Sequence, residues 1–448
     1  MNYQRLREKV LEKHYPSDEE IQELEKQYQE ISELIESEFG LETHFAGSAS
    51  RGTCMKGDRD IDVFVLFPEG TDTNTLEEKG LEIGRKVFEE IGRDYEVDYA
   101  EHPYTKGEIK EHEVEIVPCI DTEAENITSS VDRTPHHSRW VKNNLDSKQR
   151  EDVVMLKRFL RSEGIYGSSL KTEGFSGYLC EVLINKYGSF QNLTEEAVNW
   201  REKPVLDPEE HHEELPEKLE KKFSDEALIV IDPVDPERNV ASVLSKENLS
   251  RFVFACWKFK QSPGIDFFEI EEKTYTEFEV KQEVQGRGDF LVLEFENVDE
   301  VEDIVYPQLR KTLGRIEDEL KNRDFRIFDS GFHVGDKTRI FLELERELPE
   351  IEEMKGPKLF HGEKHVEEFC SKYDNVFVQD DRLVAKVDRE YVDGKQFLQE
   401  FLSSNLEEKG IPENIEEELS DYGFVDPLDG GEKWLNYLGE KLRVEAKQ

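Results

Sequence analysis

The feature that most constrains the fold of this chain is a glycine-serine loop followed by an apolar strand that carries two aspartates. Gly47 and Ser48 open the loop, and residues 60–67 read as the strand. Successive side chains of a strand point to opposite faces, so Asp60 and Asp62 emerge together while their apolar neighbours enter a core. A pair of hard oxygen ligands beside such a loop suits Mg²⁺, which completes its shell with water and substrate phosphates.

An Asp-x-Asp pair by itself is weak evidence for a metal site, because the chain contains 104 Asp and Glu residues and most acidic pairs mark a solvated face. Here the pair lies in an apolar strand, where a carboxylate without a role is costly to bury. The surroundings therefore favour a metal-binding interpretation.

A third carboxylate is expected, because chemistry on a phosphate group with two metal ions also needs a group near the attacking oxygen. Glu113 and Glu115 share one face of the predicted strand 113–118. The residues alone leave both as candidates.

The order Gly-Ser, Arg-Gly-Thr, Asp-x-Asp resembles the nucleotidyltransferase superfamily to which polymerase beta belongs. Further segments are similar to the archaeal (class I) CCA-adding enzymes, specifically over about the first 240 residues and more loosely beyond. The segments that carry this resemblance are Val114-Glu115-Ile116-Val117-Pro118-Cys119, Val131-Asp132-Arg133-Thr134-Pro135-His136-His137, Gly164-Ile165-Tyr166-Gly167, Gly174-Phe175-Ser176-Gly177-Tyr178-Leu179-Cys180-Glu181 and Asp232-Pro233-Val234-Asp235 with Arg238-Asn239-Val240-Ala241.

The resemblance implies an α+β multidomain fold. It consists of a mixed α/β nucleotidyltransferase head at 1–148, a mostly helical neck for base recognition at 149–263, and an α+β body and tail at 264–448 that binds tRNA. It implies template-independent addition of C, C and A to the 3′ end of tRNA with two Mg²⁺ ions, CTP and ATP. The acceptor stem and T-arm would be the contacted parts of tRNA. The oligomeric state stays open, with a homodimer among the alternatives.

The resemblance also implies roles for individual residues. It selects Glu115 as the third carboxylate, although family members carry an aspartate there, and glutamate is one methylene longer. Gly47, Ser48 and Arg51 would contact the triphosphate. The remaining nucleotide contacts that it implies are Glu101, His102, Thr134, His137, Lys157, Tyr166 and Arg238, the last as the base-reading arginine.

Length and composition bound the class of protein. At 448 residues the chain is long enough for two to four domains. We find no apolar run of the roughly 18 residues that a membrane span needs and no signal-peptide core, so we expect a cytoplasmic protein. The five cysteines are scattered, which argues against a disulfide framework or zinc site and predicts small core residues.

The net charge of −45 needs an explanation, because an acidic surface repels nucleic acid. At about 1 M salt the screening length falls to roughly 3 Å, so close Arg and Lys contacts would survive while long-range repulsion fades. We expect basic residues on the inner face of a cleft. Those of the C-terminal region that could clamp tRNA are Arg287, Arg310, Lys311, Arg315, Arg323, Arg326 and Arg339.

Hydrophobic periodicity predicts the elements. Ser17 with Glu20 forms a capping box, and Gly40 ends the helix that follows. Helices are also expected near 77–91, 149–160, 301–320, 394–402 and 413–419. Strands are expected at 43–45, 60–67, 95–101, 113–118, 275–284, 290–296, 326–334, 338–345, 376–379 and 382–387.

Two other functions stay open. A poly(A) polymerase or oligoadenylate synthetase would keep the three carboxylates but prefer ATP. The chain could also be a nucleotidyltransferase-like RNA-binding protein that has lost catalysis. The carboxylate pair argues against this alternative, because a protein that only binds RNA gains nothing from clustered, unpaired carboxylates beside the RNA.

Overall fold

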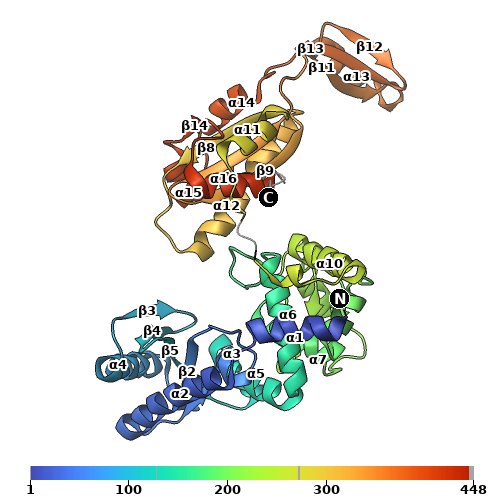
Figure 1. Cartoon of the computed structure of the whole chain (residues 1–448). Helices are drawn as coiled ribbons and strands as arrows, with labels where there is room; N and C mark the ends of the chain where they lie inside the picture. The colour runs from blue at the N-terminus through green and yellow to red at the C-terminus, as the bar shows by residue number, and fades with distance from the viewer. Residues whose placement is uncertain (1, 128, 271–272, 443–448) are drawn as a thin grey trace. The chain divides into compact units, whose positions relative to one another are not determined.

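The computed structural model describes residues 2–127, 129–270 and 273–442 (Figure 1). The chain divides by its internal contacts into two compact units, residues 1–271 and residues 272–448. No helix within the described ranges combines the length and the apolar character that crossing a membrane requires.

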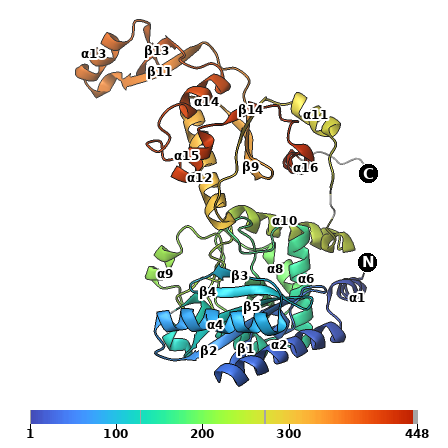
Figure 2. The ribbon, with the colours of Figure 1, turned by 90° about the vertical axis from the view of Figure 1, so that its left-hand side faces the viewer.

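The first part of unit 1 is a mixed sheet with strand order β1-β2-β5-β4-β3. The central strands β2 and β5 run parallel, and the other pairs are antiparallel. Helices α2 and α4 pack against the sheet (Figure 2), on the face that receives the buried side chains Ile61 and Val63. The bounds are α2 Asp18–Phe39, β1 Thr43–Phe45, α3 Gly47–Arg51, β2 Asp60–Pro68, α4 Thr73–Ile91, β3 Tyr95–Tyr99, β4 Pro103–Ile109 and β5 His112–Asp121.

Local signals set the ends of α2 as the sequence predicts. The Ser17 side chain accepts from the backbone N–H of Glu20, and the Glu20 side chain accepts in return from the Ser17 N–H. At the other end Gly40 adopts a left-handed conformation with φ of 67°, which costs glycine little because it has no Cβ.

The rest of unit 1 is mostly helical. Its core is a large apolar cluster to which α6, α7, α8 and α10 contribute, with Phe159 and Phe252 among its fully buried rings. Helix α5 leads from the sheet into this region. The bounds are α1 Tyr3–His14, α5 Ser130–Asn144, α6 Ser147–Ser162, α7 Gly177–Tyr187, α8 Phe190–Ala197, β6 Val205–Leu206, α9 Glu217–Lys222, β7 Ile229–Val230 and α10 Lys246–Gln261, with short 3₁₀ turns at Ala124–Asn126 and Ile265–Phe268.

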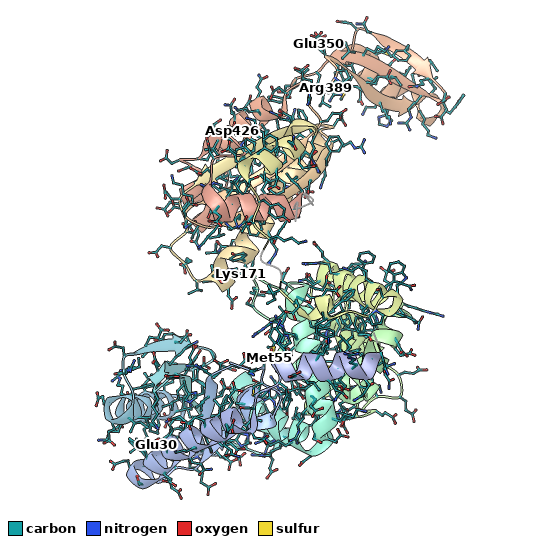
Figure 3. All side chains as sticks on the ribbon, in the orientation of Figure 1. Glu30, Met55, Lys171, Glu350, Arg389 and Asp426 are labelled. Atoms are coloured by element: carbon teal, nitrogen blue, oxygen red, sulfur yellow. The ribbon has the colours of Figure 1, made fainter. Side chains whose placement is uncertain are left out.

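Unit 2 contains a four-stranded antiparallel sheet in the order β14-β8-β10-β9, covered by α12, and a three-stranded sheet in the order β11-β13-β12 beside α13. Arg389, labelled in Figure 3, pairs with Asp324 at 3.0 Å and Glu352 at 3.3 Å and so ties the smaller sheet to the rest of this unit. The bounds are α11 Glu277–Gln285, β8 Asp289–Phe295, α12 Glu302–Asn322, β9 Ile327–Val334, β10 Thr338–Leu344, β11 Ile351–Lys358, α13 Glu363–Lys372, β12 Val376–Gln379, β13 Arg382–Asp388, α14 Gly394–Leu402, α15 Glu413–Leu419, β14 Gly423–Val425 and α16 Gly431–Lys441, with a 3₁₀ turn at Leu359–His361.

Two sequence predictions about structure are wrong. Residues 275–284 were expected to form a strand, yet 277–285 form α11, because Thr276 and Glu279 make a reciprocal capping box that starts a helix there. Cys370 is exposed and does not serve as a core residue, whereas the other four cysteines are buried.

Candidate active site

Four carboxylates come from the two central parallel strands of the sheet. The register of β2 with β5 pairs Asp60 with Glu113 and Asp62 with Glu115. Side chains alternate along each strand, so these four carboxylates lie on one face while the apolar residues between them enter the core on the other. The structure therefore brings the predicted residues Asp60, Asp62 and Glu115 to one face of the sheet.

The carboxylates are held in a poorly compensated negative environment. Burial, with the neighbouring Glu115 and Asp60 adding to it, raises the pKa of Asp62 to about 6. Burial followed by Asp58 and Glu113 raises the pKa of Asp60. Burial also raises the pKa of Glu115, against the opposing charge of Lys106. An added cation would relieve this repulsion.

A divalent metal fits the donor chemistry of the site. Carboxylate oxygens are the hard ligands that Mg²⁺ takes. A Cβ on Gly47 would lie 1.6 Å from Asp62 Oδ2, so glycine allows the loop backbone to approach this carboxylate closely. Among the residues that the structure describes, no three His, Cys, Asp or Glu side chains converge as a metal site. We infer that Lys106 keeps these carboxylates from converging, because its Nζ pairs with Glu113 and lies 3.4 Å from Glu115 Oε1.

The Gly-Ser segment is a short helical turn, α3, and not an open loop. Its entry is tied to the carboxylate strand by a hydrogen bond of 3.0 Å from the Ala46 N–H to the Asp62 carbonyl. At its end Gly52 is left-handed with φ of 67°, and the Thr53 N–H donates to the Ser48 carbonyl at 3.0 Å. Ala46 and Gly47 therefore lie against Asp62, and Ser48 follows them on a backbone that the strand positions.

Arg51 lies in a buried ion pair, where the sequence had placed a triphosphate contact. Its Nε donates to Glu181 Oε1 at 2.9 Å, and its Nη1 donates to the Ser138 hydroxyl at 3.3 Å. The Thr53 hydroxyl donates to the same Glu181 oxygen. These contacts join the turn to α5 and α7. No local pattern predicts them, because Glu181 is 130 residues away in the chain.

Lys157 and Tyr166 come together beside the same turn. The Lys157 Nζ is buried and donates to the Thr53 carbonyl at 2.8 Å. A Cβ on Gly177 would lie 3.3 Å from the Tyr166 hydroxyl and 3.5 Å from the Lys157 Nζ, so both side chains end at the start of α7. The Arg161 guanidinium lies 5.2 Å from the centre of the Tyr166 ring.

His137 and Arg238 converge on one buried carboxylate, Asp232. His137 Nε2 lies 2.9 Å from Asp232 Oδ2, and Arg238 Nη1 donates to the same oxygen at 2.7 Å. Thr134 lies one turn before His137 on α5 and is half-buried. Asp232 lies in a segment that carries the family resemblance, yet no role was predicted for it, although the Asp-Pro-Val-Asp run just before the predicted base reader is a usable signal.

Glu101 and His102 follow β3 in the turn to β4. The Glu101 carboxylate accepts from the Ser130 N–H at 2.7 Å and from the Ser130 hydroxyl at 3.0 Å, which places it at the start of α5. His102 Nδ1 lies 3.4 Å from Glu77 Oε1 on α4. Their contacts within the described ranges thus anchor the sheet to α4 and α5 and do not join Arg238.

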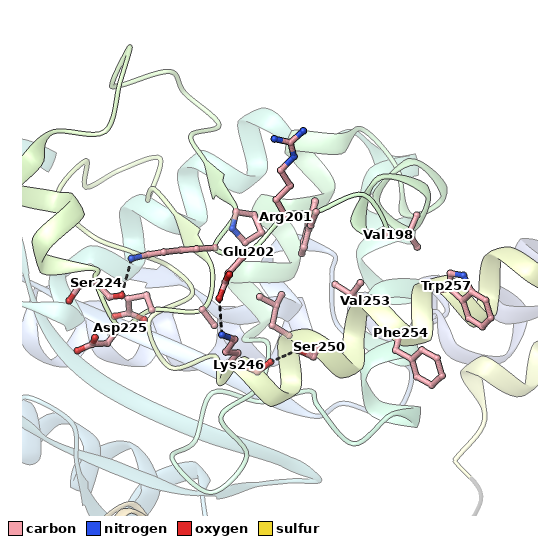
Figure 4. Close-up of a pocket in the computed structure, with 16 residues that line it drawn as sticks. Val198, Arg201, Glu202, Ser224, Asp225, Lys246, Ser250, Val253, Phe254 and Trp257 are labelled. Carbon is pink, nitrogen blue, oxygen red and sulfur yellow. Dashed lines mark hydrogen bonds and ion pairs between the residues drawn. The ribbon is translucent and has the colours of Figure 1, made fainter. Parts of the chain in front are cut away.

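A hollow of about 870 Å³ lies elsewhere in unit 1, between α10 and the segment 198–204 (Figure 4). It is mostly apolar, and the stacked rings of Phe254 and Trp257 stand at its end with 58% and 51% of their surfaces exposed. Asp60, Asp62 and Glu115 do not line it. We place the candidate active site at these three residues, because carboxylates that two adjacent strands bring to one face can hold the metal ions that transfer chemistry needs.

The basic residues expected to clamp tRNA are largely engaged within unit 2. Arg339 is buried and pairs with Asp336 and Glu294, so the structure contradicts its expected place on a surface. Arg287 pairs with Glu343 at 2.8 Å. The others in intramolecular pairs are Arg315 with Glu319 and Arg323 with Glu390, while Arg326 lies over the Phe328 ring.

Three family models match successive parts of the chain. The nucleotidyltransferase domain matches residues 21–137, the second domain of tRNA nucleotidyltransferase matches 151–269, and the C-terminal domain of the CCA-adding enzyme matches 287–424.

Relatives that are named CCA-adding enzymes extend the likeness over nearly the full length. The CCA-adding enzyme of Methanocaldococcus jannaschii is 39% identical over 96% of this chain and 95% of its own. That of Archaeoglobus fulgidus is 36% identical over 94% of each chain, and that of Thermococcus gammatolerans is 35% identical over 100% and 97%. A crystal structure of the Cid1 poly(U) polymerase is similar over 60% of this chain and 99% of its own, at 14% identity and a TM-score of 0.48. At this identity and coverage, the chain belongs to the family of CCA-adding enzymes.

Proposed function

We propose that this protein adds C, C and A to the 3′ end of tRNA without a nucleic-acid template, using CTP and ATP and releasing pyrophosphate. The observation that carries the proposal is the register of β2 and β5, which puts Asp62 beside Glu115 in a chain of this family. Enzymes with a nucleotidyltransferase domain work with divalent metal ions and nucleoside triphosphates.

The proposed cofactor is a pair of Mg²⁺ ions, which when bound would polarise the RNA 3′ hydroxyl and neutralise charge on the triphosphate. Asp60 and Asp62 would hold them from one strand, and Glu115 from the next. Glu115 would have to exchange its Lys106 neighbour for a cation. The hydroxyl oxygen forms the new bond to the α-phosphorus, the bond from that phosphorus to the pyrophosphate oxygen breaks, and the hydroxyl proton passes to solvent.

The remaining predicted residues would bind the nucleotide or support the residues that do. Ser48 and the backbone N–H groups of Gly47 and its neighbours lie beside Asp62, where the triphosphate would sit. Arg51 and Lys157 would then act mainly by holding the turn in place, since both are buried and bonded to protein groups. The other proposed nucleotide contacts are Glu101, His102, Thr134, His137, Tyr166 and Arg238.

We also propose the division of labour expected from the sequence. Residues 1–148 would perform the transfer, residues 149–263 would recognise the base, and residues 264–448 would bind the acceptor stem and T-arm by shape and backbone contacts. A cytoplasmic location suits the proposed substrates. A homodimer stays a prediction.

The test incubates the purified protein with Mg²⁺ and tRNA transcripts that end before CCA, after C and after CC. CTP or ATP is supplied separately at low and at high salt. CTP addition to the first two transcripts and one ATP addition to the last are expected. Long tails made from ATP alone would identify a poly(A) polymerase, and no incorporation at any salt would leave an RNA-binding protein.

A further inference from the structure

Asp232 lies between two side chains that are proposed to contact different ends of the nucleotide. Its Oδ2 accepts from His137 Nε2 at 2.9 Å and from Arg238 Nη1 at 2.7 Å. His137 is a proposed phosphate or sugar contact, and Arg238 the proposed base reader. The carboxylate itself has no exposed surface, so it serves these neighbours and not a ligand.

The second oxygen of Asp232 is also fully used. The Tyr178 hydroxyl donates to Oδ1 at 3.1 Å, and the Val234 N–H donates to it at 3.0 Å. The Tyr178 ring also stacks on His137, with 3.9 Å between the ring centres. Rotating the carboxylate would break hydrogen bonds at both oxygens at once. Asp232 is therefore held in one orientation and holds His137 and Arg238 in turn.

The loop that carries Asp232 and Arg238 is fastened from two sides. On the α5 side, Arg133 pairs with Asp235 at 3.2 Å. On the other side, His211 Nε2 lies 3.1 Å from the Pro233 carbonyl, and His212 Nε2 lies 3.1 Å from the Pro236 carbonyl. Helix α5, which carries His137, thus sets the position of the base-reading loop as well.

Arg238 keeps free donors for a ligand. A guanidinium has five N–H donors in a rigid fork. Within the described part of the chain, only Nη1 of this side chain has a protein acceptor. The side chain is 34% exposed and lines a hollow of about 440 Å³ together with Arg133 and Asn239. Asp232 therefore fixes one edge of the fork and leaves the other directed at whatever enters the hollow.

We propose that Asp232 is a positioning residue for nucleotide choice, which holds the base-reading guanidinium and the His137 imidazole in one shared geometry. The inference rests on the proposed function of this site. A base that matches the fixed donor pattern of Arg238 is accepted, and a base that needs a rotated guanidinium is rejected. Without the carboxylate, Arg238 can turn toward either pattern, so discrimination falls while the transfer chemistry at Asp60 and Asp62 is preserved.

The experiment measures kcat/KM for CTP and for UTP on a tRNA that ends before CCA, with wild type and Asp232→Asn. The ratio of CTP to UTP is expected to fall at least tenfold in the variant, mainly through faster use of UTP and a higher KM for CTP. In an Arg238→Ala background the same change is expected to leave the ratio nearly unaltered, because the group that Asp232 positions is gone.

Asp152→Asn is the matched control. Asp152 is also a buried aspartate of the helical region, paired with Arg7 at 3.0 Å, and it contacts neither His137 nor Arg238. This variant should lose stability but keep the wild-type ratio. The proposal would be overturned if Asp232→Asn lowered kcat/KM for CTP and for UTP by the same factor. It would also be overturned if Asp232→Asn lowered the CTP to UTP ratio as much in the Arg238→Ala background as in wild type.

Two further measurements keep the inference testable. If Asp232→Asn does not fold, Tyr178→Phe removes one bond to the carboxylate and should lower the ratio in the same direction, and an unaltered ratio overturns the proposal. If wild type incorporates no nucleotide, the proposed function fails. Equilibrium binding of CTP and UTP with a tRNA that ends in a 3′-deoxy residue then decides on Asp232, since selectivity lost in Asp232→Asn supports its role and unchanged selectivity refutes it.

Discussion

Replacing Asp62 with asparagine should remove activity and at the same time stabilise the metal-free protein. Within the described ranges, the Asp62 side chain has no hydrogen bond or ion pair, and it faces Glu115 on the neighbouring strand. The charge of Asp62 therefore lowers the free energy of unfolding. Asparagine has the same shape and no charge, so Asp62→Asn relieves the repulsion without leaving a cavity.

The magnitude follows from the pKa of this carboxyl group. Burial and the nearby carboxylates raise the pKa of Asp62 from 3.8 to about 6. Between these values the folded state binds more protons than the unfolded chain, so stability falls as the pH rises through this window. One pKa unit corresponds to about 1.4 kcal/mol, which puts the full penalty above pH 6 at about 3 kcal/mol. Solvent contact of the half-buried side chain makes this an upper value.

Urea unfolding at pH 7 and pH 4 in the presence of EDTA measures the effect. Asp62→Asn should be more stable than wild type at pH 7, and the difference should vanish at pH 4, where the wild-type carboxyl is protonated. Added Mg²⁺ should stabilise wild type and not the variant. Asp94→Asn, an exposed change in the same unit, is the control with no expected shift. An Asp62→Asn protein that is less stable than wild type at pH 7 would refute this account.

Three more predictions concern single features of unit 1. Asp60→Ala should lower incorporation of nucleotide at least a thousandfold with an unaltered circular dichroism spectrum, as should chelation of divalent metal in wild type, and turnover close to normal would contradict the metal assignment. Arg51→Ala should cost about 3–5 kcal/mol of unfolding free energy in urea titrations, because it leaves the Glu181 carboxylate buried and unpaired; an unchanged midpoint would mean that Arg51 serves only a ligand. Burial lowers the pKa of His14 and of His44 to about 4, with nearby Arg158 and Lys142 adding to it respectively, so the stability that their neutral forms contribute should be lost as the pH falls from about 6.5 to 4. His44→Gln should flatten the fall in urea midpoint between pH 7 and pH 5, and an equally steep fall in the variant would count against this cause.

Much of the fold was predictable because its signals are local. The α2 bounds follow from the Ser17 capping box and from Gly40, and the strand 60–67 follows from its apolar alternation. The error at 275–284 has the same origin. Alternating apolar residues indicated a strand, while the capping box of Thr276 and Glu279 indicated a helix, and the cap prevailed because it satisfies backbone N–H groups that a helix start leaves open.

The sequence by itself determined that Asp60 and Asp62 share a face, because side-chain direction along a strand depends only on the residues of that strand. The tertiary structure alone decided which charges are compensated. Arg51 meets Glu181 across 130 residues, and Asp232 meets His137 across 95. The energy of such pairs depends on burial and on the distance between groups that are remote in the chain. Neither the burial nor the distance can be read from composition or residue spacing. The partners of Arg51 and the contacts of Asp232 are therefore set only when the helices pack.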